Sequence, residues 1–199
     1  MPAPDLSAIR TVFLDRDGTI NVRPPEGEYV TSPGGLVLLP GAARAVARLN
    51  AAGVRTVLVT NQSWLSRSSG NSACYAAIQA RLAQLLAAEG ARLDAAYHCP
   101  HAPATCDCRK PHPGLLRRAA RELRIELDKA VIVGDRDSDL MAGLAAGTLT
   151  ILLRPGAGGS AAANADAVAD DLPSAVGLIL SARSVTARNG ASPSGPATR

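Results

Sequence analysis

The sequence predicts an α/β fold with a doubly wound, mostly parallel β-sheet. Short apolar runs alternate along the chain with segments in which apolar residues recur at helical spacing. Polar side chains directly follow several of these runs. Because crossovers between parallel strands are right-handed, the carboxyl ends of such strands share one edge of the sheet, where ligands bind. The length of 199 residues suits one domain, which we expect to span residues 1–182.

The composition limits the class of protein. Hydrophobic residues make up 47% of the chain and aromatic residues only 3%, so the core is expected to consist of small aliphatic side chains. Three arginines and no acids lie within 181–199, so most of the net charge of +4 belongs to that stretch. We expect residues 183–199 to be a disordered basic tail. The nearly neutral body argues against nucleic acid as a partner.

No apolar run is long enough to cross a bilayer, and the N-terminus lacks the pattern of a secretory signal. We therefore expect a cytoplasmic protein with no membrane partner, and a monomer.

Each element rests on a local pattern. A run of β-branched and aromatic residues without a polar interruption indicates a buried strand. Helices are indicated by apolar residues at i, i+3, i+4 and i+7, with glycine at the end of several of them. The predicted strands are Thr11–Leu14, Val54–Val59, Asp94–His98, Ala130–Val133, Thr150–Leu153 and, at the edge, Ala165–Ala169. The predicted helices lie between 41 and 53, between 71 and 90, after Pro113, before Gly147 and from Pro173, and Arg154–Asn164 is expected to be a flexible loop.

Two carboxylates, Asp15 and Asp17, follow the first strand. Charges at the end of a buried strand are costly unless a cation or a proton offsets them. An Asp-Gly hairpin turn is the alternative, but no second strand follows within hairpin distance. An aspartate can attack a phosphate when a hard divalent cation cancels the charge repulsion, and a second aspartate can serve as general acid and base.

Two later strand ends are expected beside Asp15. Thr60 could hold a phosphate oxygen, with backbone amides from Asn61 onward as further donors. A simple Thr-Asn turn remains open for that motif. Asp135 follows the strand Ala130–Val133 and would complete a magnesium site, while Asp139 could orient it or its water shell.

Three cysteines and a histidine lie within ten residues, at Cys99, His101, Cys106 and Cys108. This set matches a structural Cys3His zinc site with no open position for water. A disulfide would use only two of the three thiols and suits a cytoplasmic protein poorly. Arg109 and Lys110 follow at a predicted helix N-terminus, where we expect phosphate contact; solvated surface charges are the alternative.

Five motifs, FLDRDGTIN, VTNQS, YHCPH, CDCRKPHPG and VGDRDSD, occur in this order. Together they resemble the haloacid dehalogenase-like (HAD-like) phosphatases, in the subfamily that contains the D-glycero-D-manno-heptose 1,7-bisphosphate 7-phosphatases and the histidinol-phosphate phosphatases. The resemblance covers Thr11 to Leu180. It implies a Rossmann-like sheet without a large cap domain, and a lid made of loops such as Arg23–Val30 and the zinc loop 99–108.

The resemblance also implies roles for individual residues. Asp15 would be the nucleophile, and Asp17 the acid and base that lends its backbone carbonyl to Mg²⁺. Asp15 and Asp135 would be further Mg²⁺ ligands, and Thr60 and Lys110 would hold the phosphoryl group. The residues expected to bind substrate are Arg23, Asn61, Gln62, Ser63, Arg109 and Arg136.

The expected partner is a small phosphorylated metabolite. We favour the 7-phosphate of the heptose 1,7-bisphosphate, with histidinol phosphate as the alternative and a catalytically silent binding or regulatory module as a third reading. The match departs from the heptose enzymes after VTNQS. They continue Gly-aliphatic-Ala-Arg-Gly, whereas this chain has Trp64 in place of the glycine.

Overall fold

The computed structural model describes residues 5–68, 70–154 and 165–189. Its centre is a six-stranded sheet in the order β3-β2-β1-β4-β5-β6, in which every neighbouring pair is parallel. The strands are β1 (Thr11–Leu14), β2 (Arg55–Asn61), β3 (Ala95–Cys99), β4 (Ala130–Gly134), β5 (Leu149–Leu153) and β6 (Ala167–Ala169). The predicted α/β class and parallel sheet are confirmed.

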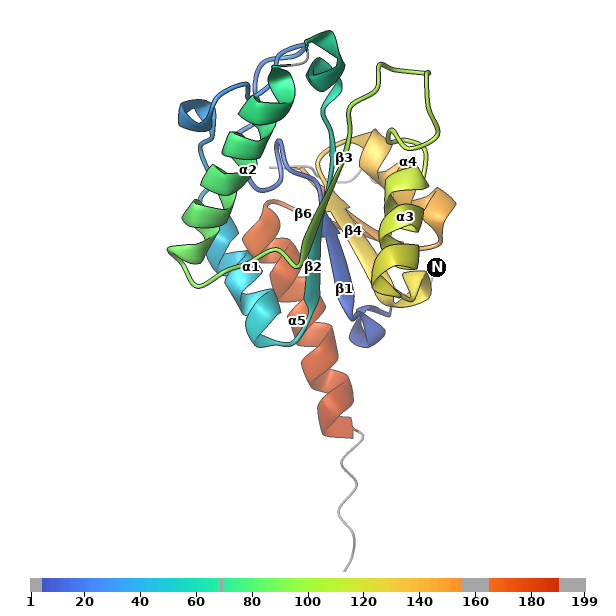
Figure 1. Cartoon of the computed structure of the whole chain (residues 1–199). Coiled ribbons are helices and arrows are strands. Elements are labelled where there is room, and N and C mark those ends of the chain that lie inside the picture. The colour runs from blue at the N-terminus through green and yellow to red at the C-terminus, as the bar shows by residue number, and fades with distance from the viewer. Residues whose placement is uncertain (1–4, 69, 155–164, 190–199) are drawn as a thin grey trace, which may run out of the picture.

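Helices cover both faces of the sheet. They are α1 (Ala42–Ala51), α2 (Asn71–Ala87), α3 (Gly114–Leu123), α4 (Asp137–Ala146) and α5 (Leu172–Asn189). In Figure 1, α1, α2 and α5 lie on one side of the sheet and α3 and α4 on the other. Short 3-10 helices span Leu6–Ala8, Pro33–Gly35, Ser63–Arg67 and Leu127–Lys129.

The alternation of side chains along β1 produces two hydrophobic cores. Val12 and Leu14 pack in the core beneath α1, α2 and α5, whereas Phe13 packs in the core beneath α3 and α4. Successive side chains of a strand point to opposite faces, so a strand buried on both faces must be apolar throughout. All four β1 residues are indeed buried.

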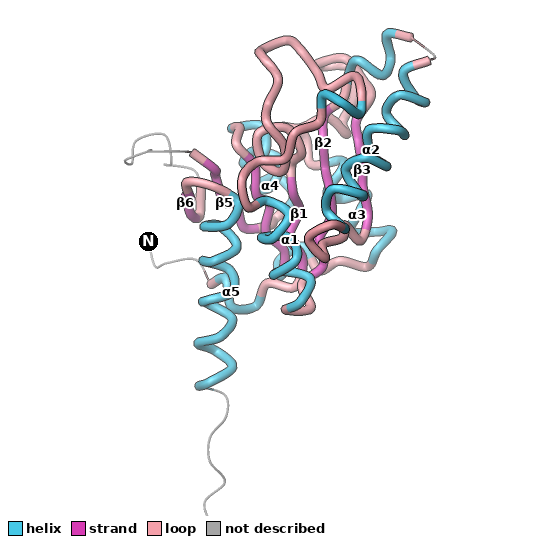
Figure 2. The backbone as a smooth tube through the Cα atoms, turned by 90° about the vertical axis from the view of Figure 1, so that its left-hand side faces the viewer, coloured by secondary structure: helices cyan, strands magenta, loops and turns pink. Residues whose placement is uncertain are grey.

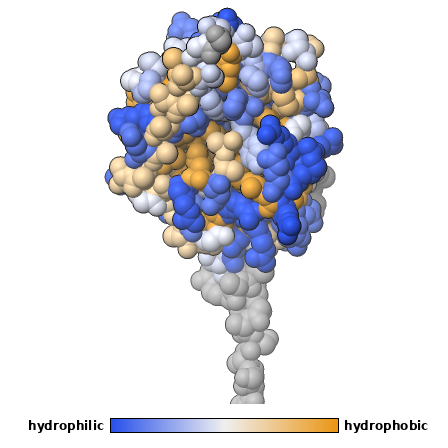
Figure 3. All heavy atoms as spheres, in the orientation of Figure 1, coloured by the Kyte–Doolittle hydropathy of each residue, from blue (hydrophilic) through white to orange (hydrophobic). Residues whose placement is uncertain are grey.

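The outer face of α3 is polar. Arg117, Arg118, Arg121 and Glu122 are exposed there. Figure 3 shows hydrophilic surface on the side where α3 lies. Among the described helices, none is both long enough and apolar enough to cross a bilayer.

Three boundaries differ from expectation. Thr60 and Asn61 belong to β2 rather than to the loop after it, because the pairing with β3 continues to Cys99. The serine-rich stretch after β2 includes the 3-10 helix Ser63–Arg67. The predicted loop Arg154–Asn164 lies almost wholly outside the described residues.

The prediction of a disordered tail from residue 183 is wrong for 183–189. Helix α5 continues to Asn189, and Figure 1 shows its last part projecting beyond the sheet. Arg183 donates to the carbonyl oxygens of Ile9 and Ala52, which ties this part of the helix to the body. Residues 190–199 lie outside the described part of the chain.

Candidate active site and cysteine cluster

The ends of β1, β2 and β4 bring the predicted residues to one edge of the sheet. Leu14 pairs with Leu58 of β2 and with Val133 of β4, so Asp15 emerges between these two strands. The backbone N–H of Asp15 donates to the Val133 carbonyl at 3.1 Å. In Figure 2, loops gather at the upper end of the central strands.

A cavity of about 300 Å³ lies at this edge, a volume at the lower end of the range for small-molecule sites. Its charged and polar walls include Asp15, Asp17, Arg23, Glu28, Thr60, Asn61, Arg109, Lys110, Arg136 and Asp139. The loop from Arg23 to Tyr29 forms one wall, as expected of a lid segment. The described residues form a single sheet, and no cap domain lies over it.

Lys110 is the central cation of the site. Its side chain is only 2% exposed, and its Nζ lies 2.7 Å from Asp15 Oδ1 and 2.5 Å from Asp139 Oδ1. It also donates to the carbonyl oxygen of Val59 at 2.8 Å. Burial would lower the pKa of Lys110, but Asp139 and Asp15 together raise it above its usual value, so this lysine is a fixed positive charge.

Three carboxylates of the site form a candidate metal centre. Oxygens of Asp15, Asp135 and Asp139 lie within 4.8 Å of one another. Burial raises the pKa of Asp15 to about 6, against the opposing attraction of Lys110. Burial also raises the pKa values of Asp135 and Asp139. Buried carboxylates that repel one another are the oxygen donors that Mg²⁺ prefers, so this set fits a magnesium ion.

Arg23 reaches back from the lid loop and forms an ion pair with Asp135. Next to it, Gly18 has a positive φ of +91°, and any Cβ at that position would overlap the Asp135 carboxylate. The turn after Asp17 therefore requires glycine both for its backbone conformation and for the close approach of Asp135.

Asp17 is held by a set of donors. Arg16 donates to both of its carboxylate oxygens, at 3.2 and 3.0 Å. Asn21 donates to Oδ1 and Gln62 to Oδ2, each at 2.9 Å. Arg16 is fully buried. Sequence reasoning assigned no role to Arg16 or Asn21; the signal was an arginine between two aspartates at the end of a buried strand, where a cation needs a carboxylate partner.

The residues expected to bind substrate divide into two groups. Arg23, Asn61, Arg109 and Arg136 line the cavity, whereas Gln62 and Ser63 are not among the described residues of its wall. Gln62 is fully buried against Asp17, and Ser63 lies 2.7 Å from the Tyr29 hydroxyl. The Asn61 carboxamide uses both ends on the backbone of Lys110, donating to its carbonyl at 2.9 Å and accepting from its N–H at 3.1 Å.

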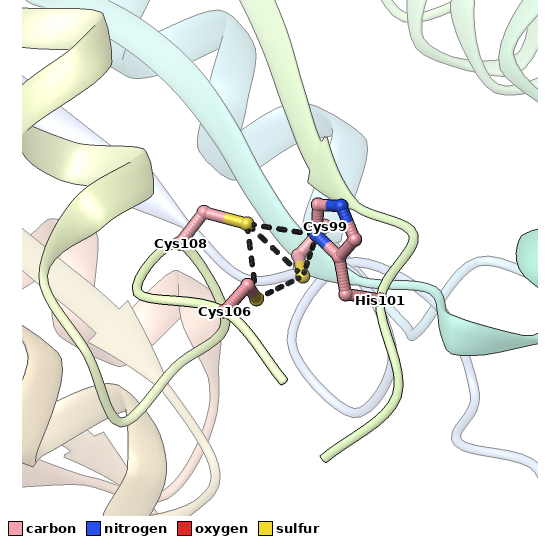
Figure 4. Close-up of side chains that lie close together, drawn as sticks. All are labelled: Cys99, His101, Cys106 and Cys108. Carbon is pink, nitrogen blue, oxygen red and sulfur yellow. Dashed lines mark hydrogen bonds between the residues drawn. The ribbon is translucent and has the colours of Figure 1, made fainter. Parts of the chain in front are cut away.

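The four predicted zinc ligands converge at the end of β3 (Figure 4). The Sγ atoms of Cys99, Cys106 and Cys108 lie 3.3–3.5 Å apart, and His101 Nδ1 lies 3.2 Å from Cys108 Sγ. A disulfide requires about 2.05 Å between sulfurs, so the cluster holds free thiols. Thiolates with one imidazole are a donor set for zinc, and the residues present fit that ion.

Comparison with known proteins agrees with this geometry. A family model described as HAD-hydrolase-like matches residues 107–175. The D-glycero-β-D-manno-heptose-1,7-bisphosphate 7-phosphatase of Pseudomonas putida is 38% identical over 151 residues, which are 75% of this chain and 85% of that protein. The enzyme of the same name from Yersinia pestis is 37% identical over 185 residues, covering 85% of this chain and 96% of that protein.

This chain belongs to the HAD-like phosphatases, in the subfamily of the heptose bisphosphate enzymes. The crystal structure of D,D-heptose 1,7-bisphosphate phosphatase from B. bronchiseptica, complexed with magnesium and phosphate, superposes with a TM-score of 0.77 at 34% identity. It covers 87% of this chain and 99% of that chain. The resemblance drawn from the motifs is therefore confirmed, and this HAD-like phosphatase is an enzyme.

Proposed function

We propose that this HAD-like phosphatase removes the 7-phosphate of D-glycero-D-manno-heptose 1,7-bisphosphate through an aspartyl-phosphate on Asp15. The observation that carries the proposal is the position of Asp15: a buried carboxylate, 2.7 Å from the Lys110 ammonium, at the base of a cavity lined by several cations. The relatives at 36–39% identity carry the name of the β-anomer enzyme, and we extend that anomer to this chain.

Two metals belong to the proposal. Asp15, Asp135 and the backbone carbonyl of Asp17 would hold Mg²⁺, which offsets the repulsion between the attacking carboxylate and the phosphate. Cys99, His101, Cys106 and Cys108 would hold a structural Zn²⁺ that orders the loop leading to Arg109 and Lys110.

The reaction has two steps. A carboxylate oxygen of Asp15 attacks phosphorus, the bond from phosphorus to the sugar oxygen breaks, and Asp17 gives its proton to that oxygen. A water molecule then attacks phosphorus and transfers a proton to Asp17, while the bond to Asp15 breaks and phosphate leaves. Thr60 and Lys110 hold the phosphoryl oxygens, so the same donors serve both steps.

The charges around the cavity favour a bisphosphate. Arg23, Arg109 and Arg136 line it, and a second phosphate gives these cations a partner. Histidinol phosphate carries a cationic amine and would need a carboxylate; Glu28 is the one that the wall offers outside the aspartate cluster among the described residues.

The Asp15→Asn variant tests the chemistry. It preserves the shape of the side chain and removes the attacking charge, so kcat should fall by several orders of magnitude while the fold survives. A generic aryl phosphate, assayed with and without Mg²⁺, is the readout. Unchanged turnover in Asp15→Asn would refute the mechanism, and no turnover in the wild-type protein would favour a silent binding module.

The substrate is tested by kcat/KM on both anomers of the heptose bisphosphate and on histidinol phosphate, side by side. One well-made polar contact discriminates by about 10- to 200-fold, so a preference of at least that size for the β-anomer is expected. A preference for histidinol phosphate would overturn the substrate and leave the aspartate chemistry standing.

A further inference from the structure

A line of hydrogen bonds runs behind the cavity and ends on Asp17. The Trp64 indole N–H donates to Gln62 Oε1 at 2.7 Å. The Gln62 amide nitrogen donates to Asp17 Oδ2 and to Thr60 Oγ1, each at 2.9 Å. Trp64, Gln62 and Thr60 are between 0 and 4% exposed, so water does not compete for these bonds.

Trp64 determines which way the Gln62 carboxamide faces. An indole N–H can only donate, so it must meet the amide oxygen, and the amide nitrogen is then directed at Asp17. The reversed orientation would set Gln62 Oε1 against a carboxylate oxygen and leave the indole N–H buried without an acceptor, both of which are unfavourable.

Gln62 differs from the other donors to Asp17 in its place in the fold. Arg16 and Asn21 belong to the same loop as Asp17 and move with it. Among the described donors, Gln62 alone comes from the end of another strand, β2. Its one nitrogen contacts both Asp17 and Thr60, so it holds Asp17 at a set distance from a proposed phosphate contact.

We propose that Gln62, oriented by the Trp64 indole, is a positioning residue that holds Asp17 for proton transfer to the departing sugar oxygen. The proposal rests on the roles given to Asp15 and Asp17 under the proposed function. It also gives Trp64 a task where the resembling heptose enzymes have glycine: the indole supplies a fixed donor to the amide.

The leaving group separates positioning from mere structure. p-Nitrophenol leaves as a stable anion and needs little protonation, whereas a primary alkoxide needs the proton of a general acid. Loss of Gln62 should therefore slow phosphoryl transfer from an alkyl phosphate and spare the first release of p-nitrophenolate. Heptose bisphosphate and histidinol phosphate are both primary alkyl phosphates, so the test holds for either substrate.

The experiment measures single-turnover rates, with enzyme in excess, for p-nitrophenyl phosphate and for whichever of these two alkyl phosphates the wild-type enzyme hydrolyses. Gln62→Leu should lower the alkyl rate by about 10- to 100-fold and the aryl rate by less than about threefold. Trp64→Phe, which keeps the ring and removes the donor, should shift the ratio of the two rates in the same direction and by less.

Ser66→Ala is the matched control. Its hydroxyl donates to the Ser63 carbonyl inside the same 3-10 helix, and both of its rates should equal those of the wild type. If Gln62→Leu does not fold, Trp64→Phe carries the test. Equal loss of both rates, or an unchanged ratio, would overturn the positioning role.

Two further variants separate this inference from the function beneath it. Asp17→Asn should show the leaving-group effect more strongly than Gln62→Leu, and Asp15→Asn should release no p-nitrophenolate. If either reference variant behaves like the wild type, the proposed mechanism fails. If both behave as expected and the ratio in Gln62→Leu is normal, only the positioning role fails.

Discussion

Replacement of Lys110 by methionine would remove a buried cation from between two buried carboxylates. Its Nζ lies 2.7 Å from Asp15 and 2.5 Å from Asp139. At an effective dielectric constant of about 20, each contact contributes about 6 kcal/mol of Coulomb energy. Burial of the ammonium group costs several kcal/mol, so we expect a net loss of about 3–5 kcal/mol in the free energy of unfolding of Lys110→Met.

The loss should depend on pH. Burial raises the pKa of Asp15 to about 6 in the folded protein, above its value of about 3.9 in an unfolded chain. Such a group contributes stability that is complete below the unfolded pKa and is lost as pH rises through the folded pKa. Without Lys110 the pKa of this carboxyl group rises further, so the deficit should be smaller at pH 5 than at pH 8.

Urea denaturation of wild type and variant in magnesium-free buffer at both pH values measures these differences. Lys129→Met is the control, since Lys129 is partly exposed and pairs with Glu126 on the surface, and we expect a loss below about 1 kcal/mol. A deficit for Lys110→Met under about 1 kcal/mol at pH 8, or an equal deficit at both pH values, would refute the reasoning.

Three further predictions concern the metals and the alignment of Lys110. Protein purified without chelator should contain near-stoichiometric zinc by metal analysis, and Cys106→Ser should lower both the zinc content and kcat/KM; zinc-free, fully active protein would contradict this. Gly18→Ala, whose Cβ would overlap Asp135, should weaken Mg²⁺ binding at least about tenfold by calorimetry, and unchanged affinity would rule that out. Asn61→Ala removes both bonds to the Lys110 backbone and should cost about 1–3 kcal/mol in urea denaturation; an unchanged midpoint would show that these bonds are dispensable.

Local sequence was sufficient for most of the fold. The apolar run Thr11–Leu14 is a strand because all four of its side chains are buried on the two faces of the sheet. The helix ends at Gly53 and Gly147 were also predictable, since both glycines have positive φ angles of +68° and +84°. The end of α5 was missed because the composition after residue 182 favours disorder, whereas Arg183 bonds to carbonyls that are distant in the sequence.

The sequence by itself determined the chemistry of the site. Asp15 and Asp17 after a buried strand, Asp135 after another and the four metal-type side chains at 99–108 were identifiable, because the strand pattern predicts that the strand ends share one edge. Only the tertiary structure decided which of these side chains meet. Strand register and the path of the zinc loop set Lys110 between two carboxylates and turned Gln62 behind Asp17 instead of into the cavity. A buried polar side chain takes its role from the partner that satisfies it, and that partner is supplied by a distant part of the chain.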